Sequence, residues 1–435
     1  MAGSTAKTAP RDAVAASQDE TRTMIALGSK RGTSTNIALY PWFKFFQNLT
    51  FWQAVWFLYF QNTLSAADAL VLYAIYDLAT TVFEVPSGYM SDRLGRRRTL
   101  VAAAATGLIG AMLLVAGEGF AVFALGQILI GASTALSSGT DSALLYESLA
   151  AEGREHEVER QEIKAWRYNF VALAVSAVAG GGLFMVAQTW PFVAAAIASA
   201  VMLIIALGFR EPPRARAAPG AGGLAIQLET LRLAFSQPVL LWLLVLSVAI
   251  YVFSHLTFVI AQPFILESLQ GTGTEADTPL IAGLVSAAMM AVSVAASLWA
   301  PDLRARIGLS GILLSAFALQ VGLIAVLAAT NEIIAIGVLL LRMVPNAFSR
   351  PFILARIQPV LADATRATYV SLQSFAGRLI LAIALYVASF SSSGDGAMSY
   401  AEIQQILGWF VAAGLVCLGA MALAARRIAI DPSGT

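Results

Sequence analysis

Ionisable side chains inside long apolar runs are the residues of this sequence placed to do chemistry. Asp77 and Glu84 lie seven residues apart in one run, so they share a helix face two turns apart. At the helical rise, Glu84 lies roughly 12 Å and Asp77 roughly 22 Å from the Asp92 end of that run. Arg378 lies in a later run, roughly 17 Å from its start near Ala367, a depth between the two acids. Because charge inside a bilayer is costly, such residues mark proton, ion or substrate pathways.

Arg342 and Asn346 form a second candidate pair, one helical turn apart on a common face of another run. The planar guanidinium of arginine suits a carboxylate or a phosphate. The alternative is that a polar group of the protein itself holds Arg342. His255, in a further run, is a candidate proton or substrate contact. Its alternative is a structural histidine with satisfied hydrogen bonds.

Composition indicates that these runs lie in a membrane. Of 435 residues, 58% are hydrophobic and 12% charged, and the mean hydropathy is +0.74. That is more apolar surface than one soluble core can bury. A net charge of +1 gives no indication of a nucleic-acid partner. The single Cys417 rules out an internal disulfide and a Cys-based metal site. We therefore expect no metal and no bound cofactor.

Twelve apolar runs are each about 20 residues or longer, the length of a membrane-spanning helix. They predict an all-α membrane protein with twelve transmembrane helices. The runs are 38–60, 67–90, 99–117, 120–146, 166–187, 190–209, 237–262, 279–301, 309–329, 333–354, 367–390 and 402–425. Lys and Arg lie in alternate loops with the two tails, and the loops between are free of both. The positive-inside rule then places both termini in the cytoplasm.

A proline- and glycine-rich stretch, 210–236, divides six runs from six. We predict two pseudo-symmetric six-helix bundles, the duplicated arrangement that transporters use for alternating access around a midplane site. The predicted parts are a disordered cytoplasmic tail (1–36), an N-terminal bundle (37–209), a cytoplasmic linker (210–236), a C-terminal bundle (237–426) and a cytoplasmic tail (427–435).

A charged turn between the second and third runs carries a specific motif, Gly88-Tyr89-Met90-Ser91-Asp92-Arg93-Leu94-Gly95-Arg96-Arg97. It resembles the signature of the major facilitator superfamily, Gly-x-Leu-Ala-Asp-Arg-x-Gly-Arg-Arg/Lys, which lies between helices 2 and 3 of those transporters. The positions in register are Gly88, Asp92, Arg93, Gly95, Arg96 and Arg97, while Met90 and Ser91 replace the Leu and Ala. We also expect Asp141 or Glu147, at the end of the fourth run, to pair with these arginines in a cytoplasmic latch.

The resemblance implies that helices 2 and 11 are neighbours, so that Arg378 could pair with Asp77 or Glu84. A pair that forms in one state only, and that protonation releases, would bias alternating access. The alternative is a permanent pair that fixes packing. Many proton-coupled exporters of the superfamily have an arginine in helix 4 where this sequence has Gln127, and the helix-5 Gly-Pro pair of antiporters is absent here. Both departures weaken the case for an exporter.

The resemblance also implies that helix 1, the run 38–60, lines the cavity. Its many aromatic residues and amides suit an amphipathic or ring-bearing solute. The alternative is that the aromatics form belts at the membrane interfaces. We expect Lys44, near the cytoplasmic end of this run, to extend to the membrane surface. The predicted substrate-cavity residues are Asn48, Trp52, Gln127, His255, Arg342 and Asn346.

The sequence therefore predicts a secondary transporter, a monomer of the plasma (inner) membrane, that moves a small amphipathic organic solute. We expect coupling to a proton or other ion gradient through Asp77, Glu84 and Arg378, with a slight preference for export. One alternative is an organic-anion carrier that uses Arg342 and Arg378. Another is a non-transporting sensor on the same fold. An enzyme is disfavoured because no catalytic constellation has plausible spacing.

Overall fold

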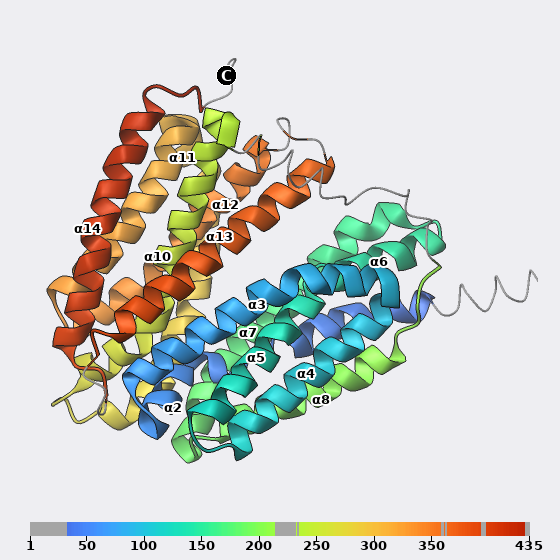
Figure 1. Ribbon diagram of the computed structural model, residues 1–435, viewed down its shortest axis with the longest axis horizontal. Helices are drawn as coiled ribbons and strands as arrows, with labels where there is room; N and C mark the ends of the chain where they lie inside the picture. The colour runs from blue at the N-terminus through green and yellow to red at the C-terminus, as the bar shows by residue number, and fades with distance from the viewer. Residues whose placement is uncertain are drawn as a thin grey trace, which may run out of the picture.

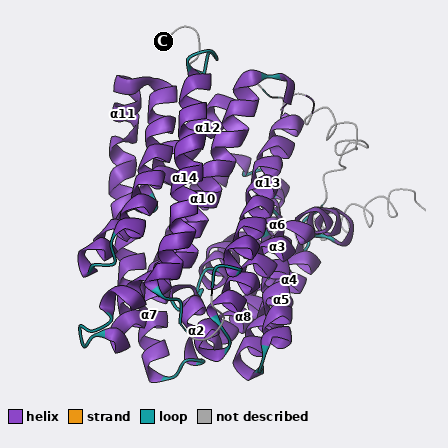
Figure 2. Cartoon of the chain, turned by 60° about the vertical axis from the view of Figure 1, so that its left-hand side comes forward, coloured by secondary structure: helices purple, strands orange, loops and turns teal. Residues whose placement is uncertain are grey.

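The computed structural model describes residues 33–213, 235–357, 363–392 and 397–430, together with Arg232 and Leu361. Within these residues the chain is all helical, as the helices and loops of Figure 2 show. Most of the predicted N-terminal tail, linker and C-terminal tail lies outside the described residues. The first helix already begins at residue 33, so it includes the last four residues of the predicted tail, 33–36.

The first half of the chain begins with a helix of residues 33–47. The elements that follow are η1 (Phe51–Ala54), α2 (Trp56–Thr63), α3 (Ala66–Leu94), α4 (Arg96–Ala116), α5 (Phe120–Ser137), α6 (Thr140–Ala151), η2 (Glu155–Glu157), α7 (Val158–Val186) and α8 (Trp190–Gly208). Ser65 caps α3, because its side chain accepts a hydrogen bond from the Asp68 amide.

The second half consists of α10 (Pro238–Leu269), η3 (Glu275–Asp277), α11 (Thr278–Ala329), η4 (Ile333–Leu341), α12 (Val344–Ile357), α13 (Asp363–Ser389) and α14 (Tyr400–Ala425). A capping box of Ser399 and Glu402 begins α14. The 52 residues of α11 are not one straight helix, since Gly308 has φ 75° and ψ 175°. The predicted spans 279–301 and 309–329 lie on the two sides of this glycine.

Ten helices among the described residues are long and apolar enough to cross a membrane. The chain is therefore a multi-pass membrane protein. One of the ten, 275–329, contains the break at Gly308, and the segment 33–63 is not among them. The total of twelve crossings in two bundles stays a prediction.

The continuous helix predicted over 38–60 is wrong. Residues 48–50 are not helical, and a short 3-10 turn separates the helix of residues 33–47 from α2. The physical reason lies in α7, where a Cβ on Gly180 would come within 1.9 Å of the Phe51 carbonyl oxygen. The backbone of η1 therefore packs directly on α7, in a space that only glycine leaves open.

A second close approach joins the two halves of the chain. A Cβ on Gly181 of α7 would lie 2.2 Å from the Pro279 carbonyl oxygen, and a Cβ on Gly283 of α11 would lie 2.3 Å from that of Ala177. These glycines let the two helices touch backbone to backbone. Gly180 and Gly181 therefore have a packing role, whereas a Cβ on Gly182 would meet nothing within 4 Å.

Figure 1 shows two groups of helices, α2–α8 and α10–α14, which lie close together near α2 and diverge toward α6 and the C-terminus. Helices α3 and α13 run side by side at their boundary, and α7 packs on α11. The implied neighbourhood of helices 2 and 11 is therefore present. It positions Asp77 and Arg378 on facing elements.

Candidate transport site

A cavity of about 710 Å³ lies between the two groups of helices. Its walls come from η1, α3, α7, α10, α11, α12 and α13, with Arg342 at the junction between η4 and α12. Five of the predicted site residues line it: Asp77, His255, Arg342, Asn346 and Arg378. These residues come from both halves of the chain, so a solute in the cavity would touch both.

Asp77 is a buried acid whose carboxylate is only partly satisfied. Its residue surface is 2% exposed, and its Oδ1 accepts a hydrogen bond of 3.4 Å from the Tyr251 hydroxyl. Its buried Oδ2 has no partner, and neither has the buried Nε of Arg378. The two charges interact across the cavity, but no direct ion pair joins them here. Asp77 is therefore available to a proton or a solute.

Glu84 lies outside the residues that line the cavity. The predicted face of α3 thus has one acid in the cavity wall and one beyond it. Of the two predicted acids, Asp77 alone is in place to contact a bound solute.

Arg342 has no acidic partner among the described residues. Its guanidinium lies 5.1 Å from the centre of the Phe258 ring, and its Nε donates to the Met289 sulfur at 3.2 Å. The first contact is a cation–π interaction and the second a weak hydrogen bond to a thioether. Among the described residues, no polar group of the run 38–60 or of α5 bonds to this side chain. A buried guanidinium with these partners retains free donors for an anion.

Two further predicted residues shape the wall beside Arg342. The Asn346 side chain donates to the Ser254 hydroxyl at 3.1 Å. The His255 ring stacks on that of Tyr251, with 3.9 Å between centroids, and its Nδ1 lies 2.9 Å from the Tyr251 carbonyl oxygen. His255 is therefore oriented by its own helix, and its other ring nitrogen is left for the cavity.

The structure adds cavity residues that sequence reasoning missed, above all Arg350. Arg342, Asn346 and Arg350 repeat every fourth residue, so they form one stripe along the start of α12. That periodicity was the available signal. Arg350 lies near the charged end of its helix, where an arginine is ordinarily interpreted as an anchor at the membrane surface, so it was not predicted to line the cavity. The cavity wall thus contains three arginines and one carboxylate.

Three predicted cavity residues do not line the cavity. The Asn48 side chain donates to the Lys44 carbonyl at 2.8 Å, where the first helix ends. Trp52 packs against the hydrophobic core. Gln127 is 4% exposed inside the first group of helices. Asn48 and Trp52 lie in or beside the break at 48–50, and Gln127 is buried in α5, so none of the three is among the residues that line the cavity.

The aromatic residues of the run 38–60 mostly fill the protein interior rather than the cavity. Tyr40, Phe43 and Phe57 are fully buried, and Gln53 is the residue of this run that lines the cavity. The expected aromatic wall from helix 1 is therefore wrong. The aromatic rings of the cavity come from α3, α7 and α10: Tyr73, Tyr76, Phe170, Tyr251 and Phe258.

One end of the cavity is closed by contacts between the two halves. The Trp56 ring lies 4.9 Å from Tyr73 and 6.2 Å from Phe258, between ring centroids. Beside them, Gln262 of α10 accepts from the Phe57 amide at 2.8 Å and donates to the Gln53 carbonyl at 2.9 Å. At the other end the cavity wall continues to Arg350, which is exposed. The cavity thus extends toward the arginine-rich side, the side of the molecule that carries the charged turn Gly88–Arg97.

The charged turn forms a compact network at that side. Arg96 contacts Glu147 at 2.9 Å and Asp92 at 2.7 Å. The Glu211 carboxylate accepts from the Arg96 and Arg97 amides at 2.7 and 3.0 Å, at the start of α4. Gly95 has φ 106°, and a Cβ there would meet that carboxylate at 2.5 Å. Glycine is therefore required at position 95 on both grounds.

The other residues of the motif lie around this network. The Arg93 guanidinium lies 5.4 Å from the centre of the Tyr89 ring. The Arg97 guanidinium donates to the Leu207 carbonyl at 3.0 Å. Gly88 lies inside α3, where a Cβ would meet no atom within 4 Å. The two motif glycines thus differ, since only Gly95 is constrained by its surroundings in this conformation.

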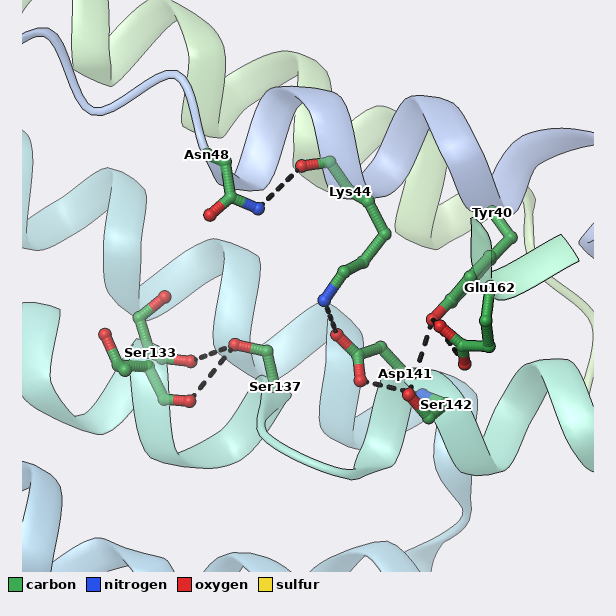
Figure 3. Close-up of polar contacts among 9 residues, drawn as sticks. Tyr40, Lys44, Asn48, Ser133, Ser137, Asp141, Ser142 and Glu162 are labelled. Atoms are coloured by element: carbon green, nitrogen blue, oxygen red, sulfur yellow. Dashed lines mark hydrogen bonds and ion pairs between the residues drawn. The ribbon is translucent and has the colours of Figure 1, made fainter. Parts of the chain in front are cut away.

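Asp141 does not join the arginine network. Figure 3 shows its carboxylate facing Lys44 of the first helix, with 2.7 Å between Oδ2 and Nζ. The neighbouring Tyr40 hydroxyl donates to Glu162 at 3.1 Å. The expectation that Lys44 extends to the membrane surface is wrong. Its ammonium group forms an ion pair with the buried carboxylate of Asp141 in α6 instead. Helix 1 is thereby tied to α6.

The family model of the Major Facilitator Superfamily matches residues 37–385. The chain belongs to this superfamily. It is therefore a transporter and not an enzyme, and the match supports secondary transport of a small solute. No curated protein sequence matches the chain.

Solved structures of superfamily transporters share the fold. A variant of the nucleoside transporter NupG superposes with a TM-score of 0.75 at 12% identity, over 90% of this chain and all (100%) of that one. An auto-inhibited POT family peptide transporter gives 0.69 at 14% identity, over 93% and 99% of the two chains. A D-xylose-proton symporter gives 0.67 at 14%, over 93% and 99%. At these identities the likeness extends to the fold alone.

Proposed function

We propose that this superfamily member is a proton-coupled secondary transporter of a small organic anion that carries an apolar or ring-bearing part. One observation carries the proposal: Arg342, Arg350 and Arg378 share a cavity with a single acid, and none of them is ion-paired with a described carboxylate. Arg342 and Arg378 are partly buried, and a guanidinium withdrawn from water without an anionic partner is energetically costly. A solute carboxylate or phosphate would supply that partner.

The cavity also supports the apolar part of the solute. Tyr73, Phe258 and Met289 surround Arg342, so an anionic group bound there would sit against rings and a thioether. Pockets of this composition bind amphipathic molecules, with few polar groups fixing their orientation. This reading joins the amphipathic solute and the organic anion, which the sequence left as alternatives.

Asp77 is our candidate for the proton site. It is the only acid among the cavity residues, it is buried, and one of its oxygens has no partner. Protonation would remove its attraction for Arg378 on the facing helix, and the freed arginine could then hold the substrate anion. Movement of α13 against α3 would follow, since these two helices line the boundary between the halves.

We further propose that twelve helices rock as two bundles in the plasma (inner) membrane, with both termini and the arginine-rich side in the cytoplasm. In that orientation the cavity extends toward the cytoplasm. Export stays a prediction, and it is weaker without an aromatic wall from helix 1. A monomer is sufficient for this mechanism, because both halves of the site come from one chain.

The test is transport by the purified full chain in proteoliposomes with an imposed pH gradient. A panel of aromatic and aliphatic carboxylates and organophosphates is compared with neutral analogues of the same rings. We expect accumulation of an anion but not of its neutral analogue. We expect Asp77→Asn to abolish gradient-driven accumulation while substrate exchange continues.

Glu84→Gln is the matched control, because Glu84 lies on the same helix outside the cavity wall. It should retain gradient-driven accumulation. Equal transport of neutral and anionic analogues would contradict the substrate class. Unchanged gradient dependence in Asp77→Asn would contradict the proton site.

A further inference from the structure

A second strongly basic recess lies at the arginine-rich side, away from the transport cavity. It encloses about 950 Å³ at the junction of α3, α4 and the end of α8. Four arginines line it, Arg93, Arg97, Arg98 and Arg210, with Glu211 as its single acid. This recess is called the arginine groove below.

Glu211 does not neutralise the arginine groove. Both of its carboxylate oxygens accept backbone amides, from Arg96 at 2.7 Å and Arg97 at 3.0 Å, at the first turn of α4. The acid therefore caps a helix, and no ion pair joins it to the groove's guanidinium groups within the described residues. Arg97, Arg98 and Arg210 therefore line a recess whose one carboxylate already accepts two backbone amides.

Hydrogen bonds to the protein hold two of the groove's arginines in place. Arg97 donates to the Leu207 carbonyl at 3.0 Å, and its buried Nε has no partner. The Arg210 backbone is fixed by Asn36 through two hydrogen bonds of 2.7 and 2.8 Å. The exposed Arg98 guanidinium contacts no described acid. The arginines that line the groove thus offer several charged donors, which suit an oxyanion with several acceptor oxygens.

Apolar surface continues from the groove along the helices. Leu94 and Leu207 line it and are 49% and 52% exposed, and Ile204 lies one turn further along α8 at 68% exposed. In a membrane protein such an outward apolar face contacts acyl chains. Positive charge for a phosphate and an apolar surface for acyl chains therefore occur side by side.

We propose that the arginine groove binds the headgroup phosphate of an anionic phospholipid, whose acyl chains lie along α8. Bound lipid would hold the end of α8 against the charged turn that begins α4. This inference concerns a lipid site and is independent of the substrate proposed above.

The test measures lipid retained by the purified full chain in mixed micelles of phosphatidylglycerol and phosphatidylcholine, by mass spectrometry of the intact complex. We expect phosphatidylglycerol to be retained preferentially. Arg98→Gln with Arg210→Gln should reduce that preference by roughly 10- to 30-fold, since each basic residue near an anionic headgroup contributes about 1 kcal/mol. Arg98→Lys with Arg210→Lys should retain most of it.

Arg306→Gln with Arg426→Gln is the control, because both arginines are exposed and lie outside the groove. The single variant Arg98→Gln keeps the test decisive if the double variant does not fold, since Arg98 has no described contact to lose. Equal retention of the two lipids, or a preference unaffected by Arg98→Gln, would overturn the proposal. Displacement of phosphatidylglycerol by inorganic phosphate alone would also overturn it, and would indicate a soluble oxyanion site.

Discussion

The transport cavity and the charged turn hold their ionisable groups in opposite ways. At the turn, Arg96 contacts two carboxylates within 3 Å, at 2.7 and 2.9 Å. In the cavity, Asp77 and Arg378 face each other without a direct bond, and Arg342 rests on a ring and a sulfur. Paired charges stabilise one conformation, whereas unpaired buried charges are costly until a ligand or proton arrives. The charged turn is therefore suited to stabilise one conformation of the transporter, and the cavity is suited to respond to a solute or a proton.

The largest effect is expected from removing an unpaired cavity charge. Arg342→Ala should raise KM for the anionic substrate by roughly 10- to 100-fold, because a charge-assisted hydrogen bond contributes about 1.5–3 kcal/mol. Arg342→Lys should fall between, since a point charge lacks the planar fork. Concentration-dependent uptake in proteoliposomes measures this, with Arg306→Gln as a control outside the cavity. Full transport by both variants would show that the Arg342 guanidinium does not bind the substrate anion.

The next effect tests whether the turn is held as tightly as its contacts indicate. Gly95→Ala should destabilise the protein by about 1–3 kcal/mol from backbone strain alone, and more because the new Cβ displaces Glu211. Gly119→Ala is the matched control. Gly119 also has positive φ, 86°, but a Cβ there meets nothing within 4 Å. A melting temperature lowered equally by both variants would mean that the Glu211 cap adds nothing.

Sequence reasoning found the residues whose signal is local. The motif around Asp92 and Arg96 is contiguous, and Asp77 and Arg342 are conspicuous as charges in apolar runs. It missed what depends on distant partners. The break at residues 48–50 lies beside η1, which packs on Gly180 far along the chain, and its polar residues, Asn48 and Thr50, were interpreted as part of a continuous span.

The expected pairing of Glu147 with the arginines of the turn is present, and the same reasoning explains the two wrong expectations for the run 38–60, which concern Lys44 and the aromatic wall. Asp141 and Lys44 come together because of how the first helix packs on α6, which composition does not encode. The aromatic run 38–60 was expected to face the cavity, yet aromaticity does not distinguish a core face from a cavity face. Helix type and motif were predictable, and the rotation of each helix about its axis was not.

A smaller effect is expected from the pair Lys44–Asp141, which lies between the two extremes of the comparison. Like the charges of the turn, Lys44 and Asp141 form a direct ion pair. Like the charges of the cavity, they are largely withdrawn from water, with side chains 24% and 5% exposed. Lys44→Met should lower stability by about 2 kcal/mol, less than for a fully buried pair, because it leaves the Asp141 carboxylate without its cation. The double variant Lys44→Met/Asp141→Leu should recover most of the loss. Thermal unfolding in one detergent measures both, and an unrecovered double variant would indicate that packing rather than charge is lost.

The smallest effect is expected at the paired charges most open to water. Arg154 contacts Glu152 at 2.8 Å and Glu157 at 2.7 Å, with its own side chain 37% exposed. Solvent screens such pairs and ordering their long side chains costs entropy, so they add little stability despite short distances. Arg154→Gln should leave the melting temperature within experimental error and should not change its dependence on salt. A loss as large as that of Lys44→Met would show that bond length, and not burial, decides which charges hold this protein together.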